Sequence, residues 1–160
     1  MPLFVDISKL ISKVKILVYG SYHPDNLPIL VNLVSFLKEK GFINTFLAKE
    51  LIKIPQELKS ENKNAFIYNE IKKKMLETDF NIFILFYNKN DSVIVELSSL
   101  VDSENFEEKY EKTLVNLPFD YDYTIVKGLI SEYKLNIFRY NNEFELEQFC
   151  FSFIKRNLIK

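Results

Sequence analysis

Short apolar runs alternate along the chain with longer stretches in which apolar residues recur at helical spacing. The runs at residues 15–19, 42–47, 81–87, 112–117 and 135–140 predict five strands. The third run is apolar almost throughout, as burial on both faces of a sheet requires. Helices are predicted from Pro28 to a stop at Gly41 and at residues 64–77, 92–101, 123–133 and 143–158.

Strands that alternate with helices are typical of a parallel sheet covered by helices on both faces. The pattern therefore predicts one α/β domain over residues 1–160, a three-layer flavodoxin-like (Rossmann-like) fold with five parallel strands in the order 2-1-3-4-5. The polar stretch at residues 48–64, which contains Pro55, has no strong period and is predicted to be a loop or excursion. Gly128 is expected inside a helix at a modest cost in propensity.

Composition narrows the classes of function. The chain has 3 glycines, too few for a glycine-rich phosphate loop. Its 21 basic and 22 acidic residues nearly balance and include only two arginines, so we expect no nucleic-acid partner. One histidine and one cysteine cannot form a zinc cluster or an internal disulfide, and we expect no metal and no cofactor. Neither a signal peptide nor a membrane span is evident, which predicts a cytoplasmic protein without a membrane partner.

Ligands of such a sheet bind beyond the carboxyl ends of the strands, at the switch point between the first and third strands. Two predicted turns meet there, at residues 20–25 and 88–92. Gly20 is expected to allow a close backbone approach or a positive φ, with Ser21 beside it. Asp91 and Ser92 are candidate ligand contacts, although each residue taken alone is better explained by the following helix, Asp91 as its N-cap and Ser92 as part of its first turn.

Glu96 is the candidate catalytic residue. At about 100° per residue, Val93, Leu97 and Leu100 share the buried side of its helix, and Glu96 lies at the border of that side with Ser92 and Ser99. Its position near the switch point favours a functional carboxylate. The alternative is a solvated side chain that the helix dipole stabilises.

The stretch from Tyr68 to Val101, with its hydrophobic third strand, polar turn and helix bearing Glu96-Leu97, resembles the nucleoside 2-deoxyribosyltransferase-like families and, more distantly, TIR-type domains. The first strand and its glycine turn, KILVYGSYHPD, look similar too. The resemblance implies cleavage or transfer of an N-glycosidic bond in a nucleoside, nucleotide or dinucleotide. It implies that Glu96 is the catalytic carboxylate, that Asp91 or Ser92 contacts the ribose or holds the turn, and that Gly20-Ser21 lines the pocket.

The chain departs from that pattern where the resembling transferases place glycines, because it has the bulky Val93, Ile94 and Val95 before Glu96. This departure favours a second hypothesis, a non-catalytic nucleotide-sensing or protein-interaction module on the same fold. A third hypothesis concerns the aromatic stretch at residues 144–154, which could dock another subunit and make a homo-oligomer.

Overall fold

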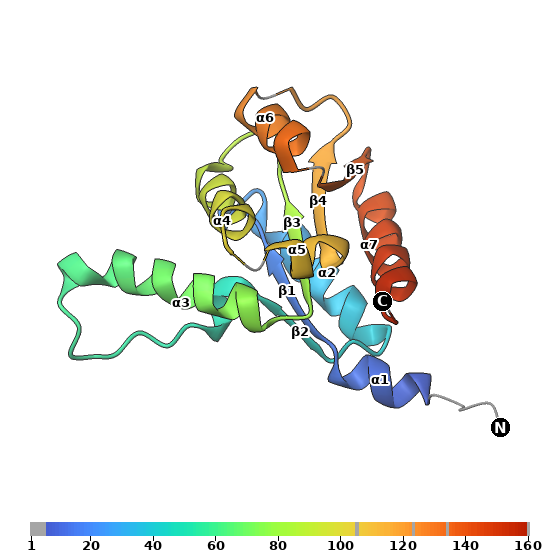
Figure 1. Cartoon of the computed structure of the whole chain (residues 1–160), viewed down its shortest axis with the longest axis horizontal. Helices are drawn as coiled ribbons and strands as arrows, with labels where there is room; N and C mark the ends of the chain where they lie inside the picture. The colour runs from blue at the N-terminus through green and yellow to red at the C-terminus, as the bar shows by residue number, and fades with distance from the viewer. Residues whose placement is uncertain (1–5, 105, 123, 134, 160) are drawn as a thin grey trace.

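A single parallel sheet of five strands forms the centre of the protein (Figure 1). The structure is a computed structural model, and it describes residues 6–104, 106–122, 124–133 and 135–159. The strand order is β2-β1-β3-β4-β5, and every neighbouring pair is parallel. The strands are β1 (Lys15–Tyr19), β2 (Asn44–Leu47), β3 (Phe80–Ile84), β4 (Thr113–Pro118) and β5 (Asn136–Tyr140). The predicted three-layer α/β fold and its strand order are confirmed.

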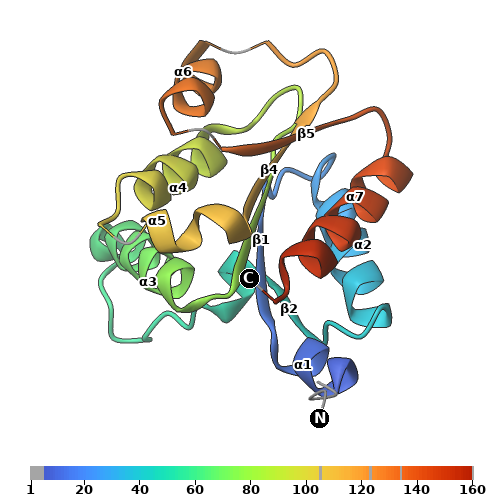
Figure 2. The same ribbon diagram turned by 45° about the vertical axis from the view of Figure 1, so that its right-hand side comes forward.

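Helices cover both faces of the sheet, as Figure 2 shows. One face carries α2 (Leu27–Glu39) and α7 (Glu143–Asn157), and the other carries α3 (Lys63–Glu77), α4 (Asp91–Val101) and α6 (Thr124–Tyr133). The shorter helices are α1 (Ile7–Lys13), α5 (Phe106–Lys109) and the 3₁₀ turns η1 (Ala48–Leu51), η2 (Ser60–Asn62) and η3 (Tyr110–Lys112). Each layer of helices packs its apolar side onto the sheet, which gives two hydrophobic clusters separated by the strands.

The third strand has the central place that its apolar sequence predicts. All five residues of β3 are buried, and the strand pairs with β1 on one side and β4 on the other. It ends at Ile84 rather than at residue 87, because the N–H and C=O of Phe86 hydrogen-bond to the side chain of Asn90 instead of a neighbouring strand. The predicted strand was therefore too long at its carboxyl end.

Helix α2 ends at Glu39, two residues before the predicted stop at Gly41, and Lys40 is its C-cap. Gly41 has φ 102°, a left-handed conformation that glycine adopts readily. The next residue, Phe42, donates its N–H to the carbonyl of Leu37, 3.1 Å away, and is fully buried. Residues 42 and 43 therefore close the helix, and β2 begins at Asn44 rather than at residue 42.

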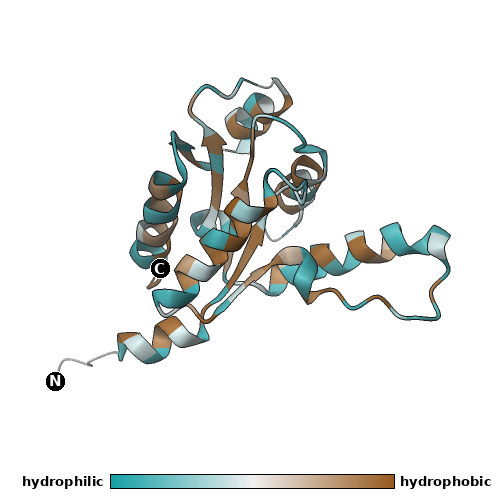
Figure 3. Ribbon diagram, turned by 180° about the vertical axis from the view of Figure 1, so that it is seen from behind, coloured by the Kyte–Doolittle hydropathy of each residue, from teal (hydrophilic) through white to brown (hydrophobic). Residues whose placement is uncertain are grey.

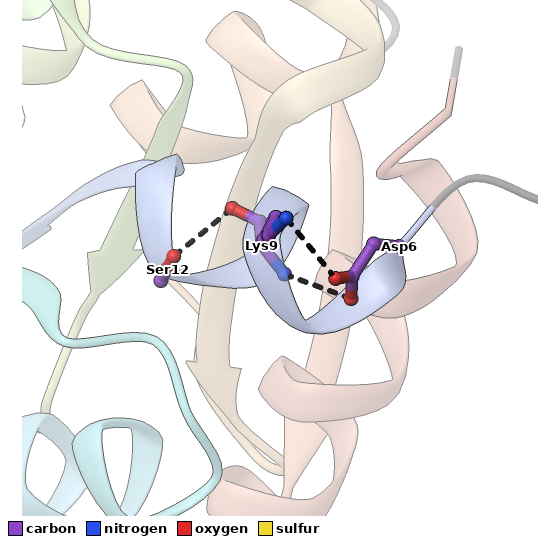
Figure 4. A network of polar contacts seen from close by, with 3 residues as sticks. All are labelled: Asp6, Lys9 and Ser12. Carbon is purple, nitrogen blue, oxygen red and sulfur yellow. Dashed lines mark hydrogen bonds and ion pairs between the residues drawn. The ribbon is translucent and has the colours of Figure 1, made fainter.

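Helix α1 was not predicted. None of the residues of this helix is buried, and its sequence has no strong apolar stripe that would face the core. Local polar contacts hold it instead (Figure 4): an oxygen of Asp6 accepts from the N–H of Lys9, the Lys9 ammonium lies 3.8 Å from the same carboxylate, and Ser12 donates to the Lys9 carbonyl. The short helix α5 in the acidic stretch after α4 was also not predicted.

The aromatic residues near the carboxyl end pack mainly within the chain itself. Phe149 stacks on Phe138 with 3.8 Å between ring centroids, and Phe151 makes an edge contact with Phe42. Phe144 is the exception, with 69% of its surface exposed. Most of this stretch thus completes the core, and its proposed role as a subunit contact stays a prediction.

A segment that we call the arm, residues 52–70, extends from the side of the domain. It consists of an irregular chain, η2 and the first half of α3, and Figures 1 and 3 show it projecting beyond the β2 edge of the sheet. Residues 53–57 and 59–65 are exposed, whereas Ile71 and Met75 further along α3 are buried in the core. The stretch predicted as an excursion, residues 48–64, therefore begins with η1 and continues into this arm, which the second half of α3 anchors.

Candidate functional site

A cleft of about 350 Å³ lies between α3 and α4. This volume is within the range of roughly 300–1,000 Å³ that is usual for small-molecule sites. One wall comes from the arm and α3, and the other from residues 91–99 of α4. The lining residues are Lys49, Asn64, Ile67, Tyr68, Ile71, Lys72, Met75, Asp91, Ser92, Val95, Glu96 and Ser99.

Glu96 lines this cleft and is buried, with 8% of its surface exposed. The spacing along α4 explains its position, because Val93, Leu97 and Leu100 on the same helix turn into the core. Ser92 and Ser99 line the cleft with Glu96, as the helical geometry predicted. The structure thus brings Ser92, Glu96 and Ser99, which the sequence placed on one flank of this helix, to one cavity.

Burial raises the pKa of Glu96 to about 7, and the positive charge of Lys49 opposes this rise. Both the protonated and the ionised form of this carboxyl group are therefore populated around neutral pH. The charge of Glu96 also contributes to raised pKa values at Tyr19 and Tyr22, although burial is the larger cause at both. A carboxyl group that titrates near pH 7 in a cleft is a typical acid–base or nucleophilic candidate.

Lys49 is the functional candidate that the sequence analysis missed. It lies in η1, directly after β2, and its ammonium is 4.5 Å from the centre of the Tyr22 ring. The Lys49 backbone N–H donates to the Tyr22 hydroxyl at 3.3 Å. A lysine just beyond the carboxyl end of β2 was the available signal, since ligands bind at that edge of the sheet.

Gly20 and Ser21 are buried in the turn after β1 but are not among the described residues that line the cleft. A Cβ at Gly20 would lie 2.5 Å from the Cδ2 of Leu30, so the glycine makes room for the side chain of Leu30. Gly41, and not Gly20, has the positive φ among the described glycines. Ser21 accepts a hydrogen bond from the N–H of His23. Their proposed ligand contacts stay predictions.

Asp91 and Ser92 are exposed residues at the start of α4, and both line the cleft. The N-cap position belongs to Asn90, not to Asp91, so the capping role predicted for Asp91 was wrong. The Asn90 side chain binds Phe86 and does not cap the helix, because it closes the turn between β3 and α4. Lys89 completes this turn with φ 63°.

Asp91 also lines a second, more polar cavity of about 370 Å³ beyond the carboxyl ends of β3 and β4. Asn88, Asp120 and Tyr121 are among its other lining residues. The start of α4 therefore separates two cavities. Glu96 belongs to the first of them, which is the cleft described above.

Within the described ranges, no group of three or more histidine, cysteine, aspartate or glutamate side chains is placed to hold a metal ion. Of the helices in the same ranges, none is long and apolar enough to span a membrane. Comparison with models of known protein families gives no match, and a search of curated proteins finds no significant similarity. The functional argument therefore depends on the chemistry of the cleft.

Proposed function

We propose that the protein cleaves or transfers the N-glycosidic bond of a nucleoside, nucleotide or dinucleotide, with Glu96 as the catalytic residue. The observation that carries this proposal is a buried carboxyl group, with a pKa near 7, facing a cleft large enough for a small ligand. Apolar side chains of Ile67, Met75 and Val95 in the same cleft offer a surface for a flat base.

The reaction needs one carboxylate at the sugar. As the bond from C1′ to the base nitrogen breaks, the base leaves with the electron pair and takes a proton from water. The Glu96 carboxylate stabilises the positive charge that develops on the sugar or forms an ester with C1′. Attack of water on C1′ then gives the free sugar and restores the carboxylate, whereas attack of a second base completes transfer.

Bulky residues before Glu96 do not close the cleft. Val93 is fully buried in the core, so it does not take space beside the ligand. Val95 lines the cleft and is 52% exposed. The cleft therefore stays open although the chain lacks glycines before Glu96, and Val95 gives it an apolar patch.

The test is base release by purified protein from deoxynucleosides, nucleoside monophosphates and nicotinamide dinucleotide, followed by chromatography. We expect release from at least one class, and loss of activity by a factor of 10² or more in a Glu96→Gln variant. Glu57→Gln, in the exposed arm, is the matched control and is expected to keep full activity. Release of no base, or equal release by both variants, would refute the proposal.

A non-catalytic nucleotide-sensing module is the second candidate. The small number of acidic side chains in the cleft favours this role. Among the described lining residues, Asp91 is the one acidic side chain besides Glu96, and it is exposed. Stabilisation by a nucleotide in a thermal-shift measurement, without turnover, would support this role. Both candidates require a nucleoside or nucleotide to bind in the cleft.

A further inference from the structure

Two lysines from different elements line the cleft of Glu96. Lys49 comes from η1 beyond β2, and Lys72 comes from α3. Among the described residues, neither lysine makes an ion pair within 4.0 Å. Their positive charges are therefore available to a ligand in the cleft.

Lys49 is an exposed residue whose backbone and ammonium both contact Tyr22. The Tyr22 ring lies 4.5 Å from its ammonium, and the Tyr22 hydroxyl accepts its backbone N–H. A cation over an aromatic face is stabilised there but keeps donors for another partner. Tyr22 comes from the turn after β1, so this turn and η1 meet at the lysine.

The charge of the cleft favours an anion. Lys49 and Lys72 contribute two positive charges, against the exposed Asp91 and the partly protonated Glu96. Lys49 and Glu96 line one cavity without direct contact at ion-pair distance, so a ligand can touch the carboxyl group with one part and the ammonium with another. The apolar lining between α3 and α4 suits an uncharged ring.

We propose that Lys49, positioned by Tyr22, forms with Lys72 a subsite for the phosphate of the substrate, so that the protein acts on nucleoside monophosphates in preference to nucleosides. This inference rests on the proposed function, because it assigns the substrate class of the Glu96 cleft. Lysine ammonium groups bind phosphate as point charges and hydrogen-bond donors.

The test compares binding of matched pairs, adenosine with its 5′-monophosphate and thymidine with its 5′-monophosphate, to the Glu96→Gln protein by calorimetry. We expect the phosphate to strengthen binding at least tenfold at low salt, and Lys49→Met or Lys72→Met to remove most of this gain. Lys49→Arg should preserve it. Lys73→Met, an exposed neighbour that does not line the cleft, is the control and should change nothing.

Binding at several salt concentrations separates the contribution of charge from that of packing. The gain from phosphate should decrease as salt rises from 50 to about 500 mM, because the Debye length shortens. Equal binding of nucleoside and monophosphate, or an equal loss in Lys73→Met, would overturn the subsite. Circular dichroism of each variant shows whether it is folded, and Lys49→Arg tests the charge if Lys49→Met does not fold.

The two proposals fail in different ways. Lysine-dependent binding of monophosphates without base release by the wild-type protein supports the subsite and refutes catalysis by Glu96. Base release at equal efficiency from nucleosides and monophosphates supports catalysis and refutes the subsite.

Discussion

Tyr68 on α3 and Ser99 on α4 share a hydrogen bond of 2.7 Å between their hydroxyl groups. Both residues line the cleft of Glu96, so the bond joins its two walls. Tyr68 belongs to the arm, whose first half has few buried residues. This contact therefore helps to fix the position of a wall that the core does not fully hold.

Removal of this bond should loosen the arm without unfolding the domain. Tyr68→Phe keeps the ring but loses the hydroxyl, and we expect a loss of at most about 1 kcal/mol in the free energy of unfolding. Hydrogen exchange of the amides at residues 64–71 should become faster, with little change in β3. Ser99→Ala should have the same effect, and the double variant no larger one. Additive effects in the double variant would show that the two hydroxyls do not act as a pair.

The stability of the protein should depend on pH through Glu96. Its pKa is about 7 in the folded protein and near the ordinary value of 4.5 when unfolded, so the folded state binds the proton more tightly. The stability that this proton provides is fully present below pH 4.5 and is lost as the pH rises through about 7. Glu96→Gln should therefore equal the wild type near pH 4 and exceed it by up to about 3 kcal/mol at pH 9.

Urea unfolding at a series of pH values measures this difference. Glu57→Gln, exposed in the arm, is the control and should show no such trend. A constant difference between Glu96→Gln and the wild type from pH 4 to pH 9 would contradict the raised pKa.

The rate of base release should depend on the ionisation of Glu96. If the Glu96 carboxylate acts at C1′, the rate should rise with pH and level off above about 7. Lys49→Met removes the charge that opposes the raised pKa, so it should move this midpoint to higher pH. A pH–rate profile of both proteins, with Lys53→Met as the control, checks the shift. An unchanged midpoint in Lys49→Met would show that the two charges do not interact.

Two glycines should respond to alanine in opposite directions. At Gly20 the new Cβ would lie 2.5 Å from a methyl carbon of the fully buried Leu30, and we expect a loss of about 1–3 kcal/mol. At Gly128, inside α6, nothing lies within 4 Å of the new Cβ, and the better helix propensity of alanine should add about 0.5–1 kcal/mol. Urea unfolding measures both, and a stabilised Gly20→Ala protein would contradict the close packing.

Asn90 should be important for the turn that presents Asp91. Its buried side chain binds both the N–H and the C=O of Phe86, so Asn90→Ala leaves two buried groups without these partners. We expect a loss of about 1–3 kcal/mol, measured by thermal unfolding. Asn88→Ala, exposed in the same turn, should cost far less, and equal costs would argue against this role.

Local sequence was sufficient to predict the sheet order and the position of Glu96. The apolar run of β3 allows only a central strand, and the spacing of Val93, Leu97 and Leu100 orients α4. Lys49 could not be assigned in this way, because its contact with Tyr22 joins two loops through the tertiary fold. Helix α1 escaped prediction because a local cap at Asp6, and not a buried stripe, defines it.

The arm has an evolutionary consequence. Asn64, Ile67 and Tyr68 line the cleft from a segment that projects from the domain, whereas Glu96 lies on a helix fixed to the sheet. Substitutions, insertions or exchanges within residues 52–70 can therefore reshape the ligand cleft with little effect on the carboxyl group or the hydrophobic clusters. One scaffold of this kind can diversify its ligands while it conserves its chemistry.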